Sequence, residues 1–306
     1  VSACFMLLSK GDHIVITEDV YGGTYRFVTK VLPRFGITHT FVDFTDLQAV
    51  RAAVTPETKL LYIETPSNPM LGITDIASIV NIAKEVGALT FLDNTFMTPI
   101  HQRPLDLGVD VVIHSATKFL SGHSDIVAGL VVTKDPTLSE QVYFIQNSFG
   151  SCLGVQDSFT LIQNMKTTAV RFNESARVAS VLATFLDNHP LVEKVYYPGL
   201  ASHPGADIHA RQSTSAGAVL SFSLPSYTVA KVFVEAMQIP VFAVSLGGVE
   251  SILSYPAKMS HAAMEPEERA KRGITDGLLR FSVGLENEHD LLEDFAQALE
   301  KALQVK

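Results

Sequence analysis

Residues 110–124 read DVVIHSATKFLSGHS, and the fold follows from the way this stretch divides. The apolar run 109–113 is typical of a strand buried in a parallel sheet, and the Ser/Thr/Gly-rich remainder around Lys118 is typical of a turn. A second apolar run, 88–92, ends at Asp93. Polar side chains therefore leave two buried strands at their carboxyl ends, which is where open α/β sheets bind ligands.

Short apolar strands alternate with helical patterns before this stretch. Strands are predicted at 13–17, 38–42, 59–63, 88–92 and 109–113, and helices at 25–32, 47–53 and 76–86. Helices between consecutive strands indicate right-handed crossovers and a mostly parallel sheet. The sequence therefore predicts an α/β large domain over residues 1–165.

The pattern changes after Lys118. Strands are predicted at 126–132, 195–197, 218–224, 241–244 and 278–283, and helices at 138–149, 157–189, 227–237 and 288–303. This mixture predicts a smaller α+β C-terminal domain over residues 166–306. The chain opens on an amphipathic helical pattern that stops at Gly11, and we expect an N-terminal part of the large domain to precede it.

Composition excludes several classes of protein. The 306 residues carry a formal net charge of −9, and their Lys and Arg residues form no basic stripe, so no nucleic-acid partner is expected. No run of 18 apolar residues occurs, so no membrane span or membrane partner is expected. Cys4 and Cys152 fit neither a disulfide framework nor a metal motif, which favours a cytoplasmic enzyme.

Lys118 has neighbours that suit one cofactor. A desolvated lysine loses its proton more readily and can form a Schiff base. The hydroxyls of Ser115 and Thr117 suit a phosphate, and Asp93 suits a pyridinium nitrogen. Together they predict a pyridoxal 5′-phosphate (PLP) site. The competing interpretation of Ser-x-Thr-Lys alone is a solvated surface turn, which the buried strand before it disfavours.

Two further strand ends carry candidate residues. Tyr21 precedes two glycines that allow close approach to a ligand, so its ring could stack on a cofactor and its hydroxyl could move protons. A core tyrosine beside a tight turn is the alternative. Asn68 lies in Glu64-Thr-Pro-Ser-Asn-Pro69, where prolines stiffen the chain and aim it inward, although this motif is otherwise an ordinary turn.

Arg280 lies in the strand pattern GLLRFSVG, where an unpaired buried guanidinium would be costly. Its forked donors suit a substrate carboxylate, and a structural Asp or Glu partner is the alternative. Ser245 follows the apolar run 241–244, and it could position the substrate or Lys118. Without the other motifs it would be an ordinary strand-end serine.

Several motifs occur in the order found in one known family. They are VYGGT at 20–24, ETPSNP at 64–69, DNTF at 93–96, the lysine stretch at 110–124, SLGGVES at 245–251, the stretch 256–261 and RFSVG at 280–284. Through these motifs the chain resembles the PLP-dependent enzymes of Cys/Met metabolism (trans-sulfuration) over essentially its whole length. The resemblance implies the aspartate-aminotransferase-like (type I) fold of PLP-dependent transferases. It also implies a homotetramer, a dimer of dimers with active sites shared between subunits.

The resemblance assigns roles around the cofactor. Lys118 forms the Schiff base and, once released, is the catalytic base that moves the α-proton. Asp93 pairs with the pyridine nitrogen, and Tyr21 stacks on the ring as a further catalytic residue. Ser115 and Thr117 bind the phosphate.

The resemblance also assigns the substrate contacts and the reaction. Asn68, Ser245 and Arg280 hold substrate and cofactor oxygens, with Arg280 on the α-carboxylate of an amino acid. Cystathionine γ-lyases typically have a glutamate at the position of Val244, and methionine γ-lyases a cysteine at the position of Gly23.

Residues 240–256 resemble bacterial cystathionine β-lyases. We therefore expect β-elimination of L-cystathionine to homocysteine, pyruvate and ammonia. The first alternative is a γ-lyase that forms cysteine, 2-oxobutanoate and ammonia, followed by cystathionine γ-synthase and methionine γ-lyase.

Other classes of protein explain fewer residues. A cofactor-free Schiff-base lyase or aldolase would use Lys118 but leave Asp93 without a task. A metal enzyme would use His114, His123 and His261, whose spacing matches no zinc pattern, so no metal is expected. A non-catalytic interaction module leaves the polar strand ends unexplained.

Overall fold

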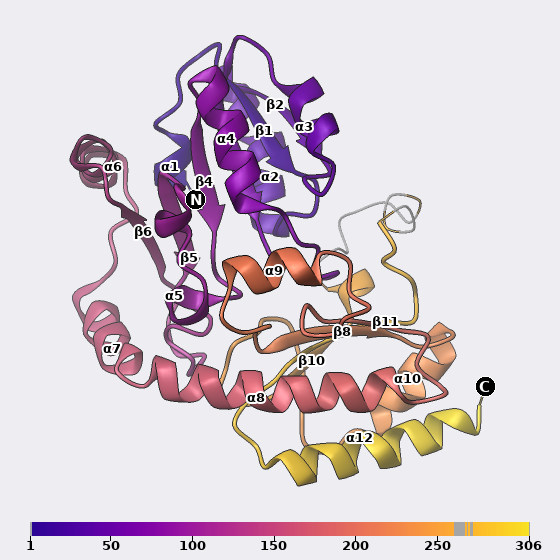
Figure 1. Ribbon diagram of the computed structural model, residues 1–306. Helices are drawn as coiled ribbons and strands as arrows, with labels where there is room; N and C mark the ends of the chain where they lie inside the picture. Colours follow the sequence, from indigo (N-terminus) through magenta and orange to yellow (C-terminus); the bar gives the residue numbers. More distant parts are fainter. Residues whose placement is uncertain (1, 260–266, 268, 270–271, 306) are drawn as a thin grey trace.

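The computed structural model describes residues 2–259, 267, 269 and 272–305. Its first sheet has six strands in the order β2-β1-β3-β4-β5-β6 (Figure 1). The strands are β1 (His13–Thr17), β2 (Thr38–Val42), β3 (Thr58–Glu64), β4 (Leu89–Asp93), β5 (Val111–Ser115) and β6 (Gly129–Thr133). The first five are parallel and β6 runs antiparallel to β5, so the predicted mostly parallel α/β sheet is confirmed.

Both faces of this sheet are buried because successive side chains of a strand point to opposite sides. On β3, Leu61 and Ile63 pack with α4, whereas Leu60 and Tyr62 pack with α2 on the other face. The helices and turns around this sheet are α1 (Ser2–Phe5), α2 (Gly22–Lys30), η1 (Leu32–Phe35), α3 (Leu47–Ala53), α4 (Ile76–Val86), α5 (Thr98–His101) and η2 (Pro104–Leu107). The short α1 differs from the longer helical pattern expected up to Gly11.

The ends of α4 show how local sequence fixes an element. The Asp75 carboxylate accepts a hydrogen bond from the Ser78 N–H at 3.0 Å, which satisfies a free donor of the first turn. Gly87 has φ = 69° and ends the helix in the left-handed conformation. The apolar side of α4 between these caps, with Ile79, Ile82 and Ala83, packs on the sheet.

The second sheet has five strands in the order β7-β8-β11-β10-β9, and α8, α10 and α12 contribute to its core. Figure 1 shows the long α8 and α12 running side by side in the lower part of the molecule. The strands are β7 (Lys194–Tyr196), β8 (Val219–Ser223), β9 (Val241–Phe242), β10 (Ile252–Ser254) and β11 (Leu278–Ser282). The helices after β6 are α6 (Pro136–Phe149), α7 (Val155–Met165), α8 (Thr168–Asp187), α9 (Ala206–Gln212), α10 (Tyr227–Ala236), η3 (Pro256–Lys258) and α12 (Glu288–Leu303).

Two expectations about this half were wrong, and two short elements were missed. The helix predicted at 157–189 is two helices, α7 and α8, which separate at residues 166–167 without a proline or glycine to signal the break. The strand predicted at 126–132 is β6, which begins at Gly129 and runs antiparallel. The short α9 and β10 were not predicted, because seven and three residues are too few to show a period.

Candidate active site

The site is built where β3, β4 and β5 end. These strands are parallel, so their carboxyl ends meet at one edge of the sheet. Glu64 and Asp93 are register partners at the ends of β3 and β4, and Ser115 ends β5. The predicted convergence of polar strand ends is therefore present in the structure.

Lys118 lies in the turn after β5, and its side chain reaches the loop after β9. Its Nζ donates to the Ser245 Oγ at 2.5 Å. Burial, with a smaller contribution from the nearby Arg280 guanidinium, lowers the pKa of the Lys118 amine from 10.5 to about 8. At neutral pH a larger fraction of this amine is therefore uncharged than for a lysine in water, and the uncharged form is the one that forms a Schiff base.

Asp93 is held by the next turn of the chain. Its Oδ1 accepts from the Thr95 N–H at 3.0 Å and from the Thr95 hydroxyl at 2.5 Å. Thr95 Oγ1 in turn accepts from the Ser115 N–H at 2.8 Å, which ties the ends of β4 and β5 together. Burial raises the pKa of the Asp93 carboxyl, which disfavours its charged form. A cation placed beside it would favour the charged form again.

The two hydroxyls predicted to bind phosphate differ in their surroundings. The Thr117 Oγ1 donates to the Ala128 carbonyl at 3.3 Å and accepts from the Ala128 N–H at 2.9 Å, so it already joins the lysine turn to the segment before β6. Ser115 is half-buried at the end of β5. Thr117 lies in the turn that contains Lys118, and Ser115 lies directly before this turn.

Arg280 of β11 is buried and contacts two of the other candidates. Its NH1 donates to Asn68 Oδ1 at 3.0 Å, and its NH2 donates to the Ser245 carbonyl at 2.6 Å and to Ser254 Oγ at 3.1 Å. Burial lowers the pKa of Arg280 to about 10, and its Nε has no hydrogen-bond partner. Among the described residues no carboxylate pairs with this guanidinium, which favours an anionic ligand over the structural Asp or Glu partner.

Tyr21 lies immediately before α2 and is 54% exposed. Its backbone N–H donates to Glu64 Oε2 at 2.9 Å. A Cβ atom at Gly23 would lie against the Tyr21 ring, so the ring occupies space that any side chain at position 23 would need. The ring is therefore not the buried core tyrosine of the alternative interpretation.

Three residues that shape the site were not among the predicted ones. Glu64 anchors Tyr21, and burial, then the Asp93 charge, raises the pKa of its carboxyl. Thr95 holds Asp93, and Ser254 binds Arg280. Glu64 and Thr95 do lie inside the quoted motifs ETPSNP and DNTF, so an acid or hydroxyl at a strand end was the available signal.

Three histidines were candidates for a metal site. His114 is buried in β5, and burial lowers its pKa to about 4. The His123 Nδ1 lies 2.6 Å from the Ser121 carbonyl. His261 lies outside the described residues. Within the described part of the chain, no group of three or more His, Cys, Asp or Glu residues could hold a metal ion.

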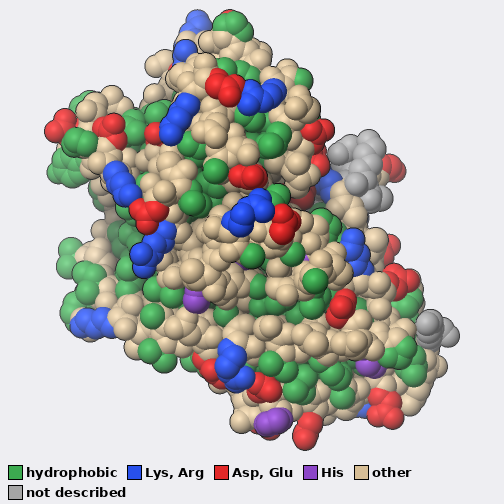
Figure 2. Space-filling model, in the orientation of Figure 1, with side chains coloured by type: hydrophobic (Ala, Val, Ile, Leu, Met, Phe, Trp, Pro, Cys, Tyr) green, Lys and Arg blue, Asp and Glu red, His purple; other side chains and the backbone are tan. Residues whose placement is uncertain are grey.

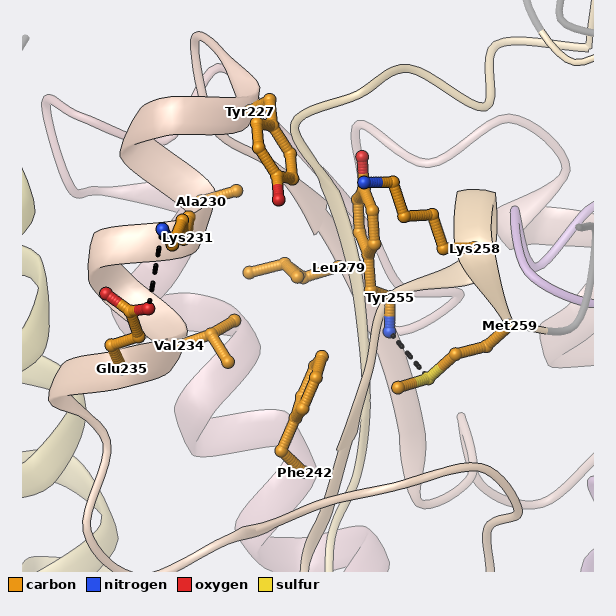
Figure 3. A pocket seen from close by; sticks show the side chains of 10 residues that line it. All are labelled: Tyr227, Ala230, Lys231, Val234, Glu235, Phe242, Tyr255, Lys258, Met259 and Leu279. Carbon is orange, nitrogen blue, oxygen red and sulfur yellow. Dashed lines mark hydrogen bonds and ion pairs between the residues drawn. The ribbon is translucent and has the colours of Figure 1, made fainter.

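Two hollows flank the strands of the second sheet. A cleft of about 740 Å³ lies beside the lysine turn, with Thr117, Val244 and Ser245 in its wall. A separate pocket of about 420 Å³ is shown in Figure 3, where Tyr227, Tyr255 and Phe242 surround it; none of its lining residues belongs to the site described above. Of these two hollows, the first is therefore the one that borders the lysine turn and Ser245.

The model of the Cys/Met metabolism PLP-dependent enzymes matches residues 1–300. The chain belongs to this family. It is 62% identical to the cystathionine beta-lyase MetC of Bacillus subtilis (strain 168), over 98% of this chain and 77% of that protein. It is 50% identical to the cystathionine gamma-lyase of the same organism, over 98% of this chain and 79% of that protein.

A solved structure of the family shares this fold. The cystathionine gamma-lyase from Lactobacillus plantarum, complexed with L-serine, superposes with a TM-score of 0.96 at 46% identity, over 99% of this chain and 79% of that one. The expected type I fold is therefore confirmed, and so is a PLP-dependent carbon–sulfur lyase. The cofactor-free aldolase alternative is wrong for a chain of this family.

The residues present fit the family's cofactor. Lys118 supplies an amine with a lowered pKa for the aldehyde carbon. Asp93 is a carboxylate that lacks a cationic hydrogen-bond partner among the described residues, as a pyridinium partner must. Tyr21 offers an exposed ring, and Ser115 and Thr117 place hydroxyls beside the lysine.

The titration of Lys118 is a direct check of this site. In the cofactor-free protein, its reaction with an amine-acylating reagent should rise through a midpoint near pH 8, because burial disfavours the ammonium. Peptide mapping by mass spectrometry after brief labelling measures this. Arg280→Met should move the midpoint upward. A midpoint that stays at the ordinary value of 10.5 would contradict the site.

Proposed function

We propose that this protein cleaves the Cβ–S bond of L-cystathionine, releasing homocysteine and, after addition of water, pyruvate and ammonia. One observation carries the chemistry: the Lys118 amine lies 2.5 Å from Ser245, whose own carbonyl binds Arg280. Ser245 thus holds both the amine that can move a proton, on Lys118, and the guanidinium that can bind a carboxylate, on Arg280. An α-amino acid whose carboxylate binds Arg280 would therefore lie next to Lys118.

Each chain residue then has a definite task. Bound PLP supplies the electron sink that makes the α-hydrogen acidic. Lys118 takes that proton and delivers it to the sulfur of the departing homocysteine. Ser245 orients the amine, and Arg280 and Asn68 hold the substrate carboxylate. Asp93 stabilises a protonated ring nitrogen, because a buried carboxylate prefers to face a positive charge.

Tyr21, Ser115 and Thr117 complete the proposed cofactor site. Tyr21 covers the ring from the start of α2, where Glu64 fixes its backbone, and its hydroxyl assists proton movement. The hydroxyls of Ser115 and Thr117 bind the phosphate from the lysine turn. The Thr117 hydroxyl exchanges its weak 3.3 Å bond to the Ala128 carbonyl for a charged acceptor.

The preference for β- over γ-cleavage is supported by position 244 and by the relatives. γ-Cleavage needs a second proton removal at Cβ, and the cleft wall beside Ser245 carries the apolar Val244, 64% exposed. The relative at 62% identity is a β-lyase, whereas the γ-lyase of the same organism is 50% identical. The γ-lyase is the second candidate, because the L. plantarum structure with a TM-score of 0.96 carries that name.

The keto acid product distinguishes the two reactions. The protein with PLP and L-cystathionine should release pyruvate and one free thiol product, homocysteine. Chromatography of the keto acids as hydrazones measures this. 2-Oxobutanoate without pyruvate would refute β-cleavage and establish the γ-lyase.

A variant at the lysine checks the site assignment. Lys118→Ala should lose the visible absorbance of a lysine-bound cofactor, together with roughly 10⁴-fold or more of its activity. Lys84→Ala, a change on α4, is the matched control and should keep both. Retention of the absorbance in Lys118→Ala would move the Schiff base to another residue.

We further propose a homotetramer, a dimer of dimers, in which α6 and α7 contact another subunit. Figure 2 shows hydrophobic side chains along the left edge of the molecule, over these helices. Phe144 is 69% exposed and Phe159 58% exposed. Large aromatic side chains exposed on consecutive helices in this way are typical of a surface that contacts another subunit.

The proposed domain limits are 1–165 and 166–306. The break between α7 and α8 at residues 166–167 supports a boundary there. We also propose a cytoplasmic location, supported by the free thiols of Cys4 and Cys152. No helix in the described part of the chain is long and apolar enough to cross a membrane.

Charges on the apolar surface should dissociate the assembly. Phe144→Asp combined with Phe159→Asp places desolvated carboxylates in the contact, so the mass measured by light scattering should fall to that of a smaller species. Phe35→Asp, on η1, is the control, because Phe35 is 48% exposed and belongs to neither α6 nor α7. An unchanged mass in the double variant would place the contact elsewhere.

A further inference from the structure

Arg171, in the first turn of α8, is a buried arginine that binds main-chain carbonyls. Its NH1 donates to the Phe119 carbonyl at 2.9 Å, and its NH2 donates to the carbonyls of Leu120 at 3.2 Å and Asn164 at 3.1 Å. Its Nε donates to the Thr167 hydroxyl at 3.0 Å. No ion pair links it to a carboxylate in the described ranges. A buried charge without a counterion is costly, so its placement calls for an explanation.

Two of the carbonyls that Arg171 binds, those of Phe119 and Leu120, belong to the lysine turn. Phe119 and Leu120 follow Lys118 directly, and the Gly122 N–H closes this turn by donating to the Lys118 carbonyl at 2.7 Å. Gly122 has φ = 76°, and a Cβ atom there would overlap the Arg171 guanidinium. The guanidinium therefore fills the space that the absent side chain of Gly122 leaves.

A second loop fixes the same turn from another direction. The Val249 N–H donates to the Gly122 carbonyl at 2.8 Å. Gly247 has φ = 77°, and a Cβ atom there would lie 2.7 Å from the Phe119 nitrogen. This loop begins at Ser245, the residue that receives the Lys118 amine. The lysine turn is thus clamped between Arg171 and the loop 245–249.

We infer that Arg171 is a positioning residue for Lys118: it binds the Phe119 and Leu120 carbonyls of the lysine turn and so fixes the amine against Ser245. The inference rests on the role of Lys118 in the proposed function. A displacement of about 1 Å at a reacting group can cost roughly 100-fold in rate. Substrate binding at Arg280 depends on other contacts, so the loss should fall on kcat and leave KM nearly unchanged.

The main test measures the turn itself in the cofactor-free protein. In Arg171→Met, amide hydrogen exchange over 118–122 should accelerate by about tenfold, because the turn loses its bonded carbonyls. Arg171→Lys should give a smaller acceleration. Arg177→Met is the matched control: Arg177 is exposed on the same helix and pairs with Glu174 and Glu288. It should leave exchange in 118–122 unchanged.

The kinetic test uses the holoenzyme. Arg171→Met should lower kcat by about 100-fold with little change in KM. In Arg171→Ala, added methylguanidinium should restore part of kcat and slow the exchange of 118–122, and it should do neither in the wild type. If Arg171→Met fails to fold, Arg171→Lys and the rescue experiment carry the test.

Two results would overturn the inference. One is unchanged exchange over 118–122 in a folded Arg171 variant. The other is an equal loss of kcat in Arg177→Met. The exchange experiment uses neither PLP nor substrate. A Lys118→Ala enzyme that keeps its lysine-bound absorbance would therefore refute the proposed function alone, while the exchange result would still report on the turn.

Discussion

The hydrogen bond from the Lys118 amine to the Ser245 hydroxyl is the interaction on which the remaining site geometry depends. It joins two segments 127 residues apart, one after a strand of the first sheet and one beside the second sheet. Ser245 also has φ = 86°, an uncommon value for a residue with a side chain. That backbone conformation lets one residue present its hydroxyl to Lys118 and its carbonyl to Arg280.

The opposite wall of the site is acidic. Glu64 and Asp93 are register neighbours, and burial raises the pKa of both carboxyls. Ionisation of both buried carboxyls on neighbouring strands is unfavourable, so one of them favours its protonated form unless a cation lies beside them. A cationic ring nitrogen would relieve the repulsion. This electrostatic arrangement therefore favours a cofactor with a cationic ring nitrogen.

The sequence predicted the parts of the fold that have a local signal. The apolar runs that became β1 to β5 are short and bounded by turn residues, and their ends moved by at most two residues. The gap between α7 and α8 has no such signal, because Lys166 and Thr167 are compatible with a helix. Its position reflects tertiary contacts, among them the bond from the Thr168 hydroxyl to the Leu120 carbonyl.

The candidate residues were predictable for a related reason. Asp93, Ser115 and Lys118 follow buried strands, and parallel strands bring such positions together without further information. Arg280 was recognisable because a charged residue interrupts an apolar strand. Arg171 was not, since an arginine in an amphipathic helix is ordinarily solvated, and its burial appears only once the lysine turn lies against α8.

The two glycines around the lysine turn limit how this enzyme could diversify. Any side chain at Gly122 meets a guanidinium, and any side chain at Gly247 meets the backbone of Phe119. Larger side chains at Gly122 or Gly247 therefore cannot provide new substrate preferences. The wall at Val244, 64% exposed beside the cleft, has room for a larger or charged side chain. Variation among such enzymes should therefore accumulate around Val244, while Gly122 and Gly247 stay the same.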